Sequence, residues 1–393
     1  MTGEGKRTCV EGHSAHIYDR GGRRRIGVLR DLSFVQWARE RDSTSEATVR
    51  ITGDACDAQQ DLLDKIRSKR HELVIFRGDD RVWEGPIWRP TLQTGFAEIV
   101  AKDVTQYLYG QPLTQEWSNL YPNTTEVTTR IGDIIAYEMT HGRTMQVYDA
   151  ATDTWVDAPV SAWESLDPAL NIIDFLTVHH FPNEARYSGR TLPYQMTVGE
   201  HLSGLARQQG IDFTAVGRAI HIWDTSRNLG VTQTLTEANF TTDVIVSEYG
   251  ADHTQAAYVV AQEGAYGQAL NLENLDYYGP WTTMYTVYND EGTEQPTQSE
   301  LNSQAQRNVS GRSPAPLEVR VPDNSGLILS DTLTINELVA GVQVPLRATL
   351  GPRKITQRQK LDHLQVTEDE NGETIQVTLT PATRPDGDDE EPV

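Results

Sequence analysis

Cysteine is scarce in this sequence: only Cys9 and Cys56 occur among the 393 residues, and they form no Cys-x-x-Cys pair. A zinc site or a dithiol redox motif therefore has no support. We expect both as free thiols, with a single Cys9–Cys56 disulfide as the open alternative. The sequence also lacks an apolar run long enough to span a bilayer, and its first residues lack the apolar core of a signal peptide. We expect synthesis in the cytoplasm and no stable membrane insertion.

Positive charge is also scarce. The chain has 34 Lys and Arg residues against 56 Asp and Glu residues, which gives a net charge of -22. Such a surface repels phosphate at long range, so we expect no tight nucleic-acid binding, although the same repulsion suits a wall that DNA slides past. With 37% hydrophobic residues the chain is expected to fold, and its length predicts two or three domains.

Signatures of catalysis are missing. The sequence has no Gly-x-Ser-x-Gly elbow, no His-Glu-x-x-His helix and no Walker loop. Cys56 stands near Asp54 and Asp57, whose charges should raise the pKa of its thiol and oppose a role as nucleophile. Glu164 and Asp167 could be paired glycosidase carboxylates, but a solvated surface is the better interpretation in so acidic a chain. We predict that the protein is not an enzyme and needs no cofactor.

The first part of the chain is rich in β-strand patterns. His16 to Leu29 predicts a hairpin with its turn at Gly21-Gly22, and Ala47 to Ile51 alternates as a strand. Leu73 to Ile87 predicts a second hairpin, which turns near Gly78. Val104 to Leu108 predicts a helical turn after it.

Helix signals appear in the middle of the chain. Thr129 to Met139 has the spacing of an amphipathic helix, and Thr197 to Glu200 is a capping box that opens another helix. Ile211 to Trp223 predicts a hairpin that turns at Gly217. His179 and His180 with Asp174 could form a metal site, or a base with the residue that orients it. Further metal ligands at fixed spacing are missing, so we interpret the histidines as the polar end of an apolar helix.

The last part returns to strands. A capping box at Thr297 to Glu300 opens a helix, and the segment Tyr277 to Trp281 is expected as a loop. Leu364 to Leu379 alternates strictly around Asn371-Gly372, which is the strongest hairpin signal in the chain.

Two β-rich ends thus enclose a mixed middle. We predict a β-rich α+β fold in which two hub-type, β-barrel-like domains, residues 1–110 and 241–380, flank an inserted α+β domain, residues 111–240. Residues 381–393 read as a disordered acidic tail.

Aromatic residues in the expected loops are the candidates for contact with a partner. They are Trp155, Trp163, Tyr277, Tyr278 and Trp281. Flat rings in loops suit carbohydrate or protein contacts, whereas the tryptophans in expected strands are predicted to pack in a core or a subunit interface. No metal-binding or catalytic residue is predicted.

A family resemblance is carried by several dispersed segments. They are Gly27–Ile51, Glu72–Ile87, Ala101–Leu108, Gly210–Arg218, Leu338–Val342 and Leu361–Thr367. Together they resemble the minor tail proteins of long-tailed phages that infect actinobacteria, which are baseplate hub proteins of the tail tip. The resemblance covers the chain apart from its acidic tail.

This resemblance implies a structural virion protein at the tail tip. It implies a homotrimeric, pseudo-sixfold ring that contacts the tail tube, the distal tail protein, the tape-measure C-terminus and other minor tail proteins. DNA would pass through the lumen of the ring during ejection. A receptor- or cell-wall-binding adhesin is the alternative, and a peptidoglycan-degrading enzyme is a third hypothesis without a supporting motif.

Overall fold

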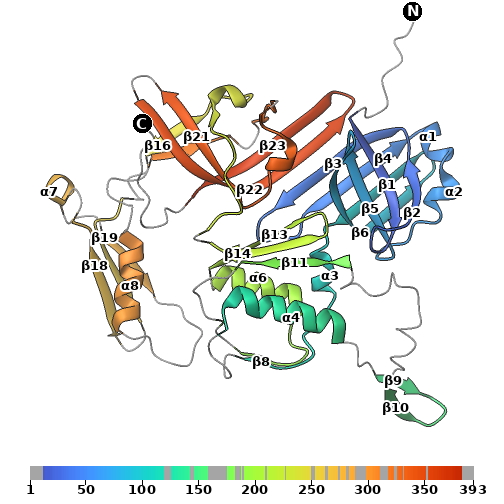
Figure 1. Ribbon diagram of the computed structural model, residues 1–393, viewed down its shortest axis with the longest axis horizontal. Coiled ribbons are helices and arrows are strands. Elements are labelled where there is room, and N and C mark those ends of the chain that lie inside the picture. Colours follow the sequence, from blue (N-terminus) through green and yellow to red (C-terminus); the bar gives the residue numbers. More distant parts are fainter. Residues whose placement is uncertain are drawn as a thin grey trace, which may run out of the picture.

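The fold is β-rich with additional helices, as predicted (Figure 1). The buried apolar side chains of the described residues form three hydrophobic cores. We name the parts the sheet body (residues 13–102, 235–248 and 317–381), the α/β unit (104–224) and the small unit (256–309). The computed structural model describes residues 12–118, 125–141, 146–157, 175–181, 187, 190–208, 210–225, 227–248, 253–261, 264–272, 275–279, 283–287, 298–309, 317–322, 325–330, 332–350 and 353–382.

The sheet body contains an eleven-stranded sheet. Its strands run in the order β15-β21-β22-β3-β4-β7-β6-β5-β1-β2, and β23 pairs with β22. The elements are β1 (His13–Asp19), β2 (Arg25–Leu29), β3 (Leu32–Glu40), β4 (Glu46–Thr52), α1 (Asp54–Asp57), α2 (Gln60–Leu63), β5 (His71–Arg77), β6 (Asp80–Gln93), β7 (Phe96–Lys102), β15 (Leu235–Thr236), η3 (Glu237–Asn239), η6 (Ile335–Glu337), β21 (Gln343–Leu350), β22 (Arg353–Asp369) and β23 (Gly372–Pro381).

The hairpins expected from turn residues are present. β1 and β2 pair antiparallel. β5 and β6 also pair antiparallel; β5 ends at Arg77 and β6 begins at Asp80. β22 and β23 form the last hairpin, with Asp369 opposite Gly372. Gly78 and Gly372 both have positive φ values, 58° and 108°, which glycine adopts without a steric penalty.

Strand β22 connects the two ends of the chain. Its second half pairs antiparallel with β3, with His363 opposite Glu40 and Glu368 opposite Val35. Its first half pairs with β21. Residues separated by more than 300 positions therefore share one sheet, so the first and last ranges of the chain are joined through the pairing of β22 with β3. The domain boundaries given above stay a prediction.

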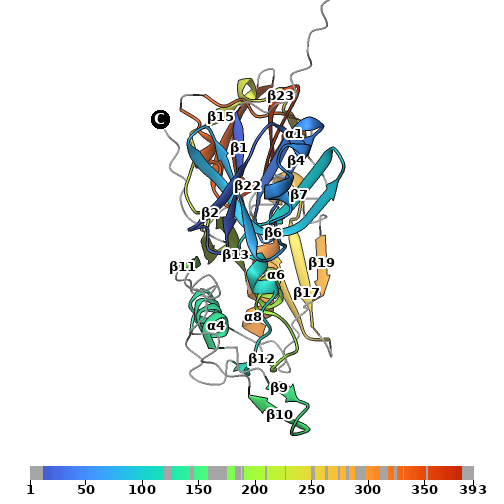
Figure 2. The same ribbon diagram turned by 90° about the vertical axis from the view of Figure 1, so that its right-hand side faces the viewer.

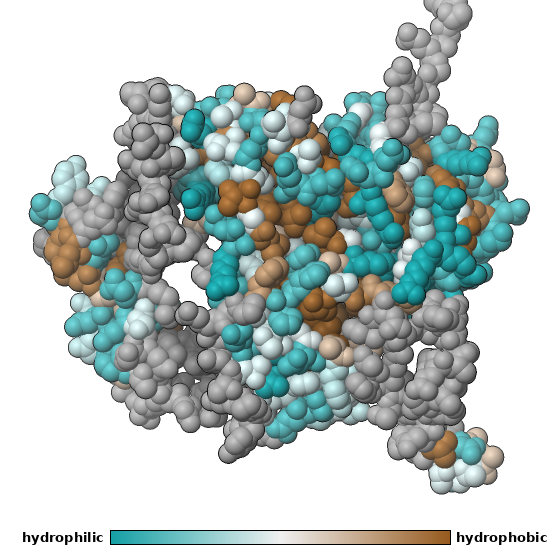
Figure 3. Space-filling view, viewed as in Figure 1, coloured by the Kyte–Doolittle hydropathy of each residue, from teal (hydrophilic) through white to brown (hydrophobic). Residues whose placement is uncertain are grey.

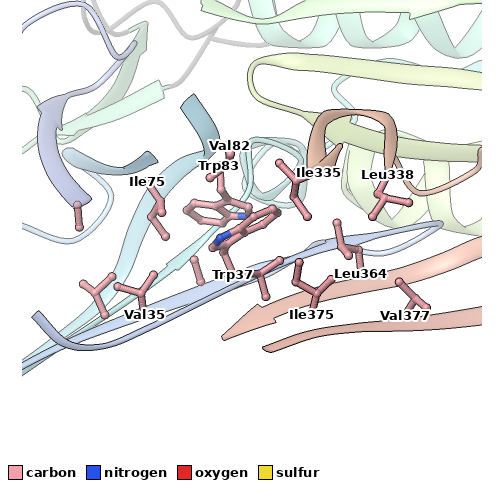
Figure 4. Packing of buried hydrophobic residues seen from close by; sticks show 14 of the residues in the cluster. Val35, Trp37, Ile75, Val82, Trp83, Ile335, Leu338, Leu364, Ile375 and Val377 are labelled. Carbon is pink, nitrogen blue, oxygen red and sulfur yellow. The ribbon is translucent and has the colours of Figure 1, made fainter. Parts of the chain in front are cut away.

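The core of the sheet body is shared in the same way. Trp37 on β3 and Trp83 on β6 are buried at its centre. Figure 4 shows their rings between Ile75 from the first part of the chain and Ile335 and Leu364 from the last part. The prediction that tryptophans in strands pack in a core is confirmed for these two residues.

The α/β unit lies below the sheet body in Figures 1 and 2. Helices α4 and α6 pack against the sheet β11-β14-β13, and the expected hairpin is β13–β14. The elements are α3 (Gln106–Tyr109), β8 (Trp117–Ser118), α4 (Val127–His141), β11 (Thr177–His180), β12 (Arg190–Thr191), α6 (Val198–Gln208), β13 (Ile211–Val216) and β14 (Ala219–Asp224). A hairpin of β9 (Gln146–Asp149) and β10 (Thr154–Asp157) projects beyond this unit.

One local prediction in the α/β unit is wrong. His179 and His180 do not end a helix; they lie in strand β11, which pairs in parallel with β14. The partner of this strand comes from about 40 residues further along the chain, so local spacing gave no sign of it. Asp174, expected beside them, lies outside the described residues.

The small unit is a three-stranded sheet with one helix. β17 (Ala256–Val260) is the central strand between β18 (Tyr266–Leu270) and β19 (Thr283–Val287). The helix expected after the second capping box is α8 (Gln298–Val309). Tyr277 and Tyr278 lie in a short helix, α7 (Leu275–Tyr278), and not in a loop. A two-stranded pair of β16 (Ile245–Glu248) and β20 (Leu317–Arg320) flanks this unit in the sequence.

Gly85 allows β6 to cross the end of β7. A Cβ atom there would overlap the carbonyl oxygen of Lys102 and lie 2.7 Å from Asp103 Cα. Gly85→Ala is therefore expected to lower the free energy of unfolding by about 3 kcal/mol or more, because backbone atoms cannot yield. Gly204, inside α6 and with open space around it, is the matched control. Gly204→Ala should raise stability by about 1 kcal/mol. If urea unfolding shows the same change in stability for Gly85→Ala and Gly204→Ala, the proposed clash at Gly85 is wrong.

Candidate functional site

Two clusters of charged side chains lie between the sheet body and the α/β unit, each built around a buried carboxylate, Glu72 in one and Asp212 in the other. The first, the Glu72 cluster, consists of Glu72, Arg81, Glu84, Tyr107 and Arg218. Glu72 comes from β5 and Glu84 from β6, whereas Arg218 lies in the turn between β13 and β14. The cluster therefore links two separate hydrophobic cores.

Each oxygen of Glu72 has its own partners. Oε1 accepts hydrogen bonds from the backbone N–H of Gly21 at 3.0 Å and from the hydroxyl of Tyr107 at 2.6 Å. Oε2 forms a close ion pair with Arg218, whose Nε lies 2.9 Å from Glu84 Oε2. Glu72 is fully buried, so its charge depends on these partners.

Burial disfavours the charged forms of Arg218 and Glu84. It lowers the pKa of Arg218 to about 10, and the nearby Arg23 adds to this shift. It raises the pKa of Glu84, against the opposing effect of Arg81. Burial also raises the pKa of Tyr107, so its hydroxyl stays protonated and donates to Glu72. The cluster is stable only while its charges stay paired.

The second cluster, the Asp212 cluster, consists of Arg41, Asp42, Asp212, Lys360 and Asp362. Arg41 Nη1 lies 2.8 Å from Asp212 Oδ1, and its Nε lies 2.7 Å from Asp362 Oδ1. Lys360 Nζ lies 2.8 Å from the other oxygen of Asp212. Arg41 follows β3, Asp212 is on β13, and Lys360 is on β22, so three distant segments meet here.

Backbone hydrogen bonds reinforce this junction. The Asp42 N–H donates to the carbonyl oxygen of Phe213 at 2.8 Å, and the Phe213 N–H donates to Asp42 Oδ1 at the same distance. The Thr214 hydroxyl donates to the carbonyl oxygen of Glu40 at 2.7 Å. Strand β13 is thus fixed to the end of β3 by both backbone and side-chain contacts.

The carboxyl of Asp42 is strongly perturbed. Burial and the neighbouring Asp212 raise its pKa to about 7, although the Phe213 N–H and Arg41 favour its charged form. Burial disfavours the Arg41 cation, but the carboxylates of Asp362, Asp212 and Asp42 raise its pKa above the usual range. Asp42 is therefore the group whose charge changes near neutral pH.

This arrangement does not form a reaction centre. Two carboxylates that share a proton also occur in acid–base enzymes, but Asp212 is only 1% exposed and its oxygens are taken by Arg41 and Lys360. Cys56 is a buried free thiol, and burial together with Asp57 raises its pKa, as predicted. Within the described ranges, no group of three or more His, Cys, Asp or Glu side chains could hold a metal ion.

The predicted partner-binding aromatics do not form one site. Trp155 lies in β10, at the tip of the molecule opposite α7, which carries Tyr277 and Tyr278 (Figure 1). Tyr277 is 82% exposed and meets Tyr278 edge-on, with ring centroids 4.8 Å apart. Trp163 and Trp281 lie outside the described residues. The partner role of these aromatics stays a prediction.

Sequence reasoning missed both charge clusters. A signal was present, because Glu84 interrupts an apolar strand segment and Asp212 stands between Ile211 and Phe213. A charged residue inside an apolar run is a sign of a buried pair. The sequence gives no indication of which opposite charge it meets.

Comparison with known proteins identifies the fold. No family model and no curated protein sequence matches the chain. The 43 kDa tail protein of prophage MuSo2 from Shewanella oneidensis matches 95% of this chain and 98% of its own, with a TM-score of 0.53 and 14% identity. The prophage tail protein gp18 from Listeria monocytogenes matches 94% of this chain and 95% of its own, with a TM-score of 0.50 and 8% identity. A tail protein from Neisseria meningitidis matches 94% of this chain and 96% of its own, with a TM-score of 0.49 and 12% identity.

The chain therefore has the fold of phage tail proteins over nearly its whole length. The sequence resemblance to tail proteins and this likeness in fold agree. The actinobacterial host and the particular hub family stay predictions. In the part of the chain that the structure describes, no helix is long and apolar enough to cross a membrane.

Proposed function

We propose that this chain is a structural protein of a phage tail tip, a baseplate hub that assembles as a homotrimeric ring. The observation that carries this proposal is the likeness in fold to the MuSo2 tail protein, which spans both chains almost completely. The virion would be its site of action, after synthesis in the cytoplasm of the host.

The two β-rich ends of the chain support the ring. A trimer whose chains each supply two β-rich parts can present six similar units around an axis, which would fit a sixfold tail tube above and a threefold tip below. Closed symmetry also covers sheet edges that would otherwise be exposed, such as β2 at one end of the large sheet. The distal tail protein, the tail tube, the tape-measure C-terminus and other minor tail proteins would be its neighbours.

The charge of the chain supports a channel for DNA. At a net charge of -22, the wall of a ring would repel phosphate and leave outgoing DNA without an adhesive track of Lys and Arg. The hub would therefore guide DNA without binding it tightly.

Mass measurement tests the ring directly. Purified at micromolar concentration, the chain should have three times its mass of 43.9 kDa. Antibodies against it should label one end of the tail in negative-stain images of virions. A monomer that is absent from particles would refute the hub. A protein that binds isolated cell walls but joins no ring would support the adhesin instead.

A further inference from the structure

Among the residues that the structure describes, no helix or strand packs on one face of the small unit. Helix α8 packs on the other face of the sheet β18-β17-β19, where Ala257, Val259, Leu301 and Ala305 are buried together. Gly267 on β18 brings the helix this close, because a Cβ atom there would overlap the backbone of Leu301. The side chains that alternate with the buried ones must point to the opposite side of the sheet.

The uncovered face, which we name the tyrosine face, consists of Tyr258, Tyr266, Leu270, Tyr285 and Val287. Strand register places these residues together. Tyr258 lies opposite Tyr285 in the parallel pair β17–β19, and Val260 lies opposite both Tyr266 and Val287. Tyr285 is 67% exposed and Val287 is 62% exposed. The face is thus a continuous aromatic and aliphatic surface in contact with solvent.

The tyrosine face also lacks charge. Its other described positions, Ala256, Val260 and Gln268, are uncharged as well. In a chain with 23% charged residues, this is unusual for an exposed surface. Two copies of the chain, each at -22, repel one another over most of their surfaces, so contact between them is favoured where acidic groups are missing.

The area is large enough for a specific contact. With roughly 200 Å² for each aromatic side chain, the exposed parts of the three tyrosines alone come to about 300 Å². Leu270, Leu272 and Val287, all exposed, extend this area toward the about 800 Å² that each partner contributes to a stable interface. Apolar patches of this size on soluble proteins are commonly binding surfaces.

We propose that the tyrosine face is a subunit interface and binds a second copy of this chain. The small unit stands at the side of the molecule, away from β1 to β7 (Figure 1), where Figure 3 shows hydrophobic residues next to hydrophilic ones. A chain in a closed ring needs such a lateral contact with its neighbour. This inference rests on the proposed ring, and it assigns the contact to one surface.

The variant Tyr285→Glu tests this assignment. It places a carboxylate at the centre of the proposed contact between two acidic chains, so the concentration at which half the chains are monomeric should rise about 30-fold or more. Tyr194 in the α/β unit is the matched control, because it is also 67% exposed. Tyr194→Glu should leave assembly unchanged. Circular dichroism verifies that both variants are folded.

A second measurement does not depend on that variant. A photo-crosslinking amino acid at position 285 should give a product of twice the chain mass on irradiation of the purified protein, whereas the same group at position 194 should not. Crosslinking to a different tail protein, or none at all in an assembled ring, would overturn the proposal. If wild type assembles and Tyr285→Glu assembles equally well, only the assignment of this face fails. If wild type stays monomeric, the ring itself fails.

Discussion

Arg218→Met is expected to lower the free energy of unfolding by about 3–5 kcal/mol, although methionine retains much of the volume of the arginine side chain. The substitution leaves the carboxylates of Glu72 and Glu84 buried without this cation, and an uncompensated buried charge is strongly destabilising. Arg81 still neutralises Glu84, so the penalty falls mainly on Glu72. Urea unfolding of the purified protein measures the change.

A second substitution should restore part of this loss. In Glu72→Gln the amide oxygen can occupy the place of Oε1 and still accept from Gly21 and Tyr107, while the uncharged amide nitrogen takes the place of Oε2, which faced Arg218. The double variant Arg218→Met, Glu72→Gln should therefore be more stable than Arg218→Met alone. Arg227→Met, at an exposed position, is the control and should be nearly neutral. If Glu72→Gln restores nothing, the buried carboxylate is not the cause of the loss.

Asp42→Asn is expected to stabilise the protein in a manner that depends on pH. Burial and the neighbouring Asp212 raise the pKa of Asp42 from its ordinary value of 3.8 to about 7 in the folded protein, so the folded state binds the proton more tightly than the unfolded state. Asp42 therefore makes stability fall as the pH rises from about 4 to about 7. Asparagine keeps an oxygen for the Phe213 N–H and has no proton to lose. At about 1.4 kcal/mol per pKa unit, we expect the free energy of unfolding of Asp42→Asn to exceed that of wild type by roughly 2–4 kcal/mol at pH 8.

The difference in the free energy of unfolding between Asp42→Asn and wild type should grow as the pH rises from about 4 to about 7, and it should level off at higher pH. Unfolding measured at pH 4, 6 and 8 follows the trend directly. Asp64→Asn, at an exposed position after α2, should show no such growth. A constant difference at all three pH values would show that Asp42 is not the titrating group at this junction.

Local signals in the sequence predicted most of the elements. Asn371-Gly372 predicted the hairpin of β22 and β23, because the turn needs residues that tolerate positive φ. The capping box that begins at Thr197 predicted helix α6, and the structure shows the reciprocal hydrogen bonds between Thr197 and Glu200. These features depend on residues close together in the sequence.

The contacts between distant segments could not be predicted. No local pattern pairs β3 with β22, because any apolar alternating strand satisfies the same rule. The separate core of the small unit also escaped prediction, since Val259 and Leu301 read simply as strand and helix interior. Glu72 and Asp212 pair with Arg218 and Lys360 because the sheet body and the α/β unit pack together. The spacing of residues in a single sequence does not predict how two units pack.

The pairing of β3 with β22 has a consequence during synthesis. About 320 residues separate the two strands, and at roughly 5–20 residues per second the ribosome needs on the order of 15–60 s to produce the second after the first. For that interval the edge of β3 that later receives β22 presents free backbone N–H and C=O groups. Nascent chains on neighbouring ribosomes carry the same open edge at the same time. Slow translation or crowded polysomes should thus increase misassembly of this protein even though its finished form is fully paired there.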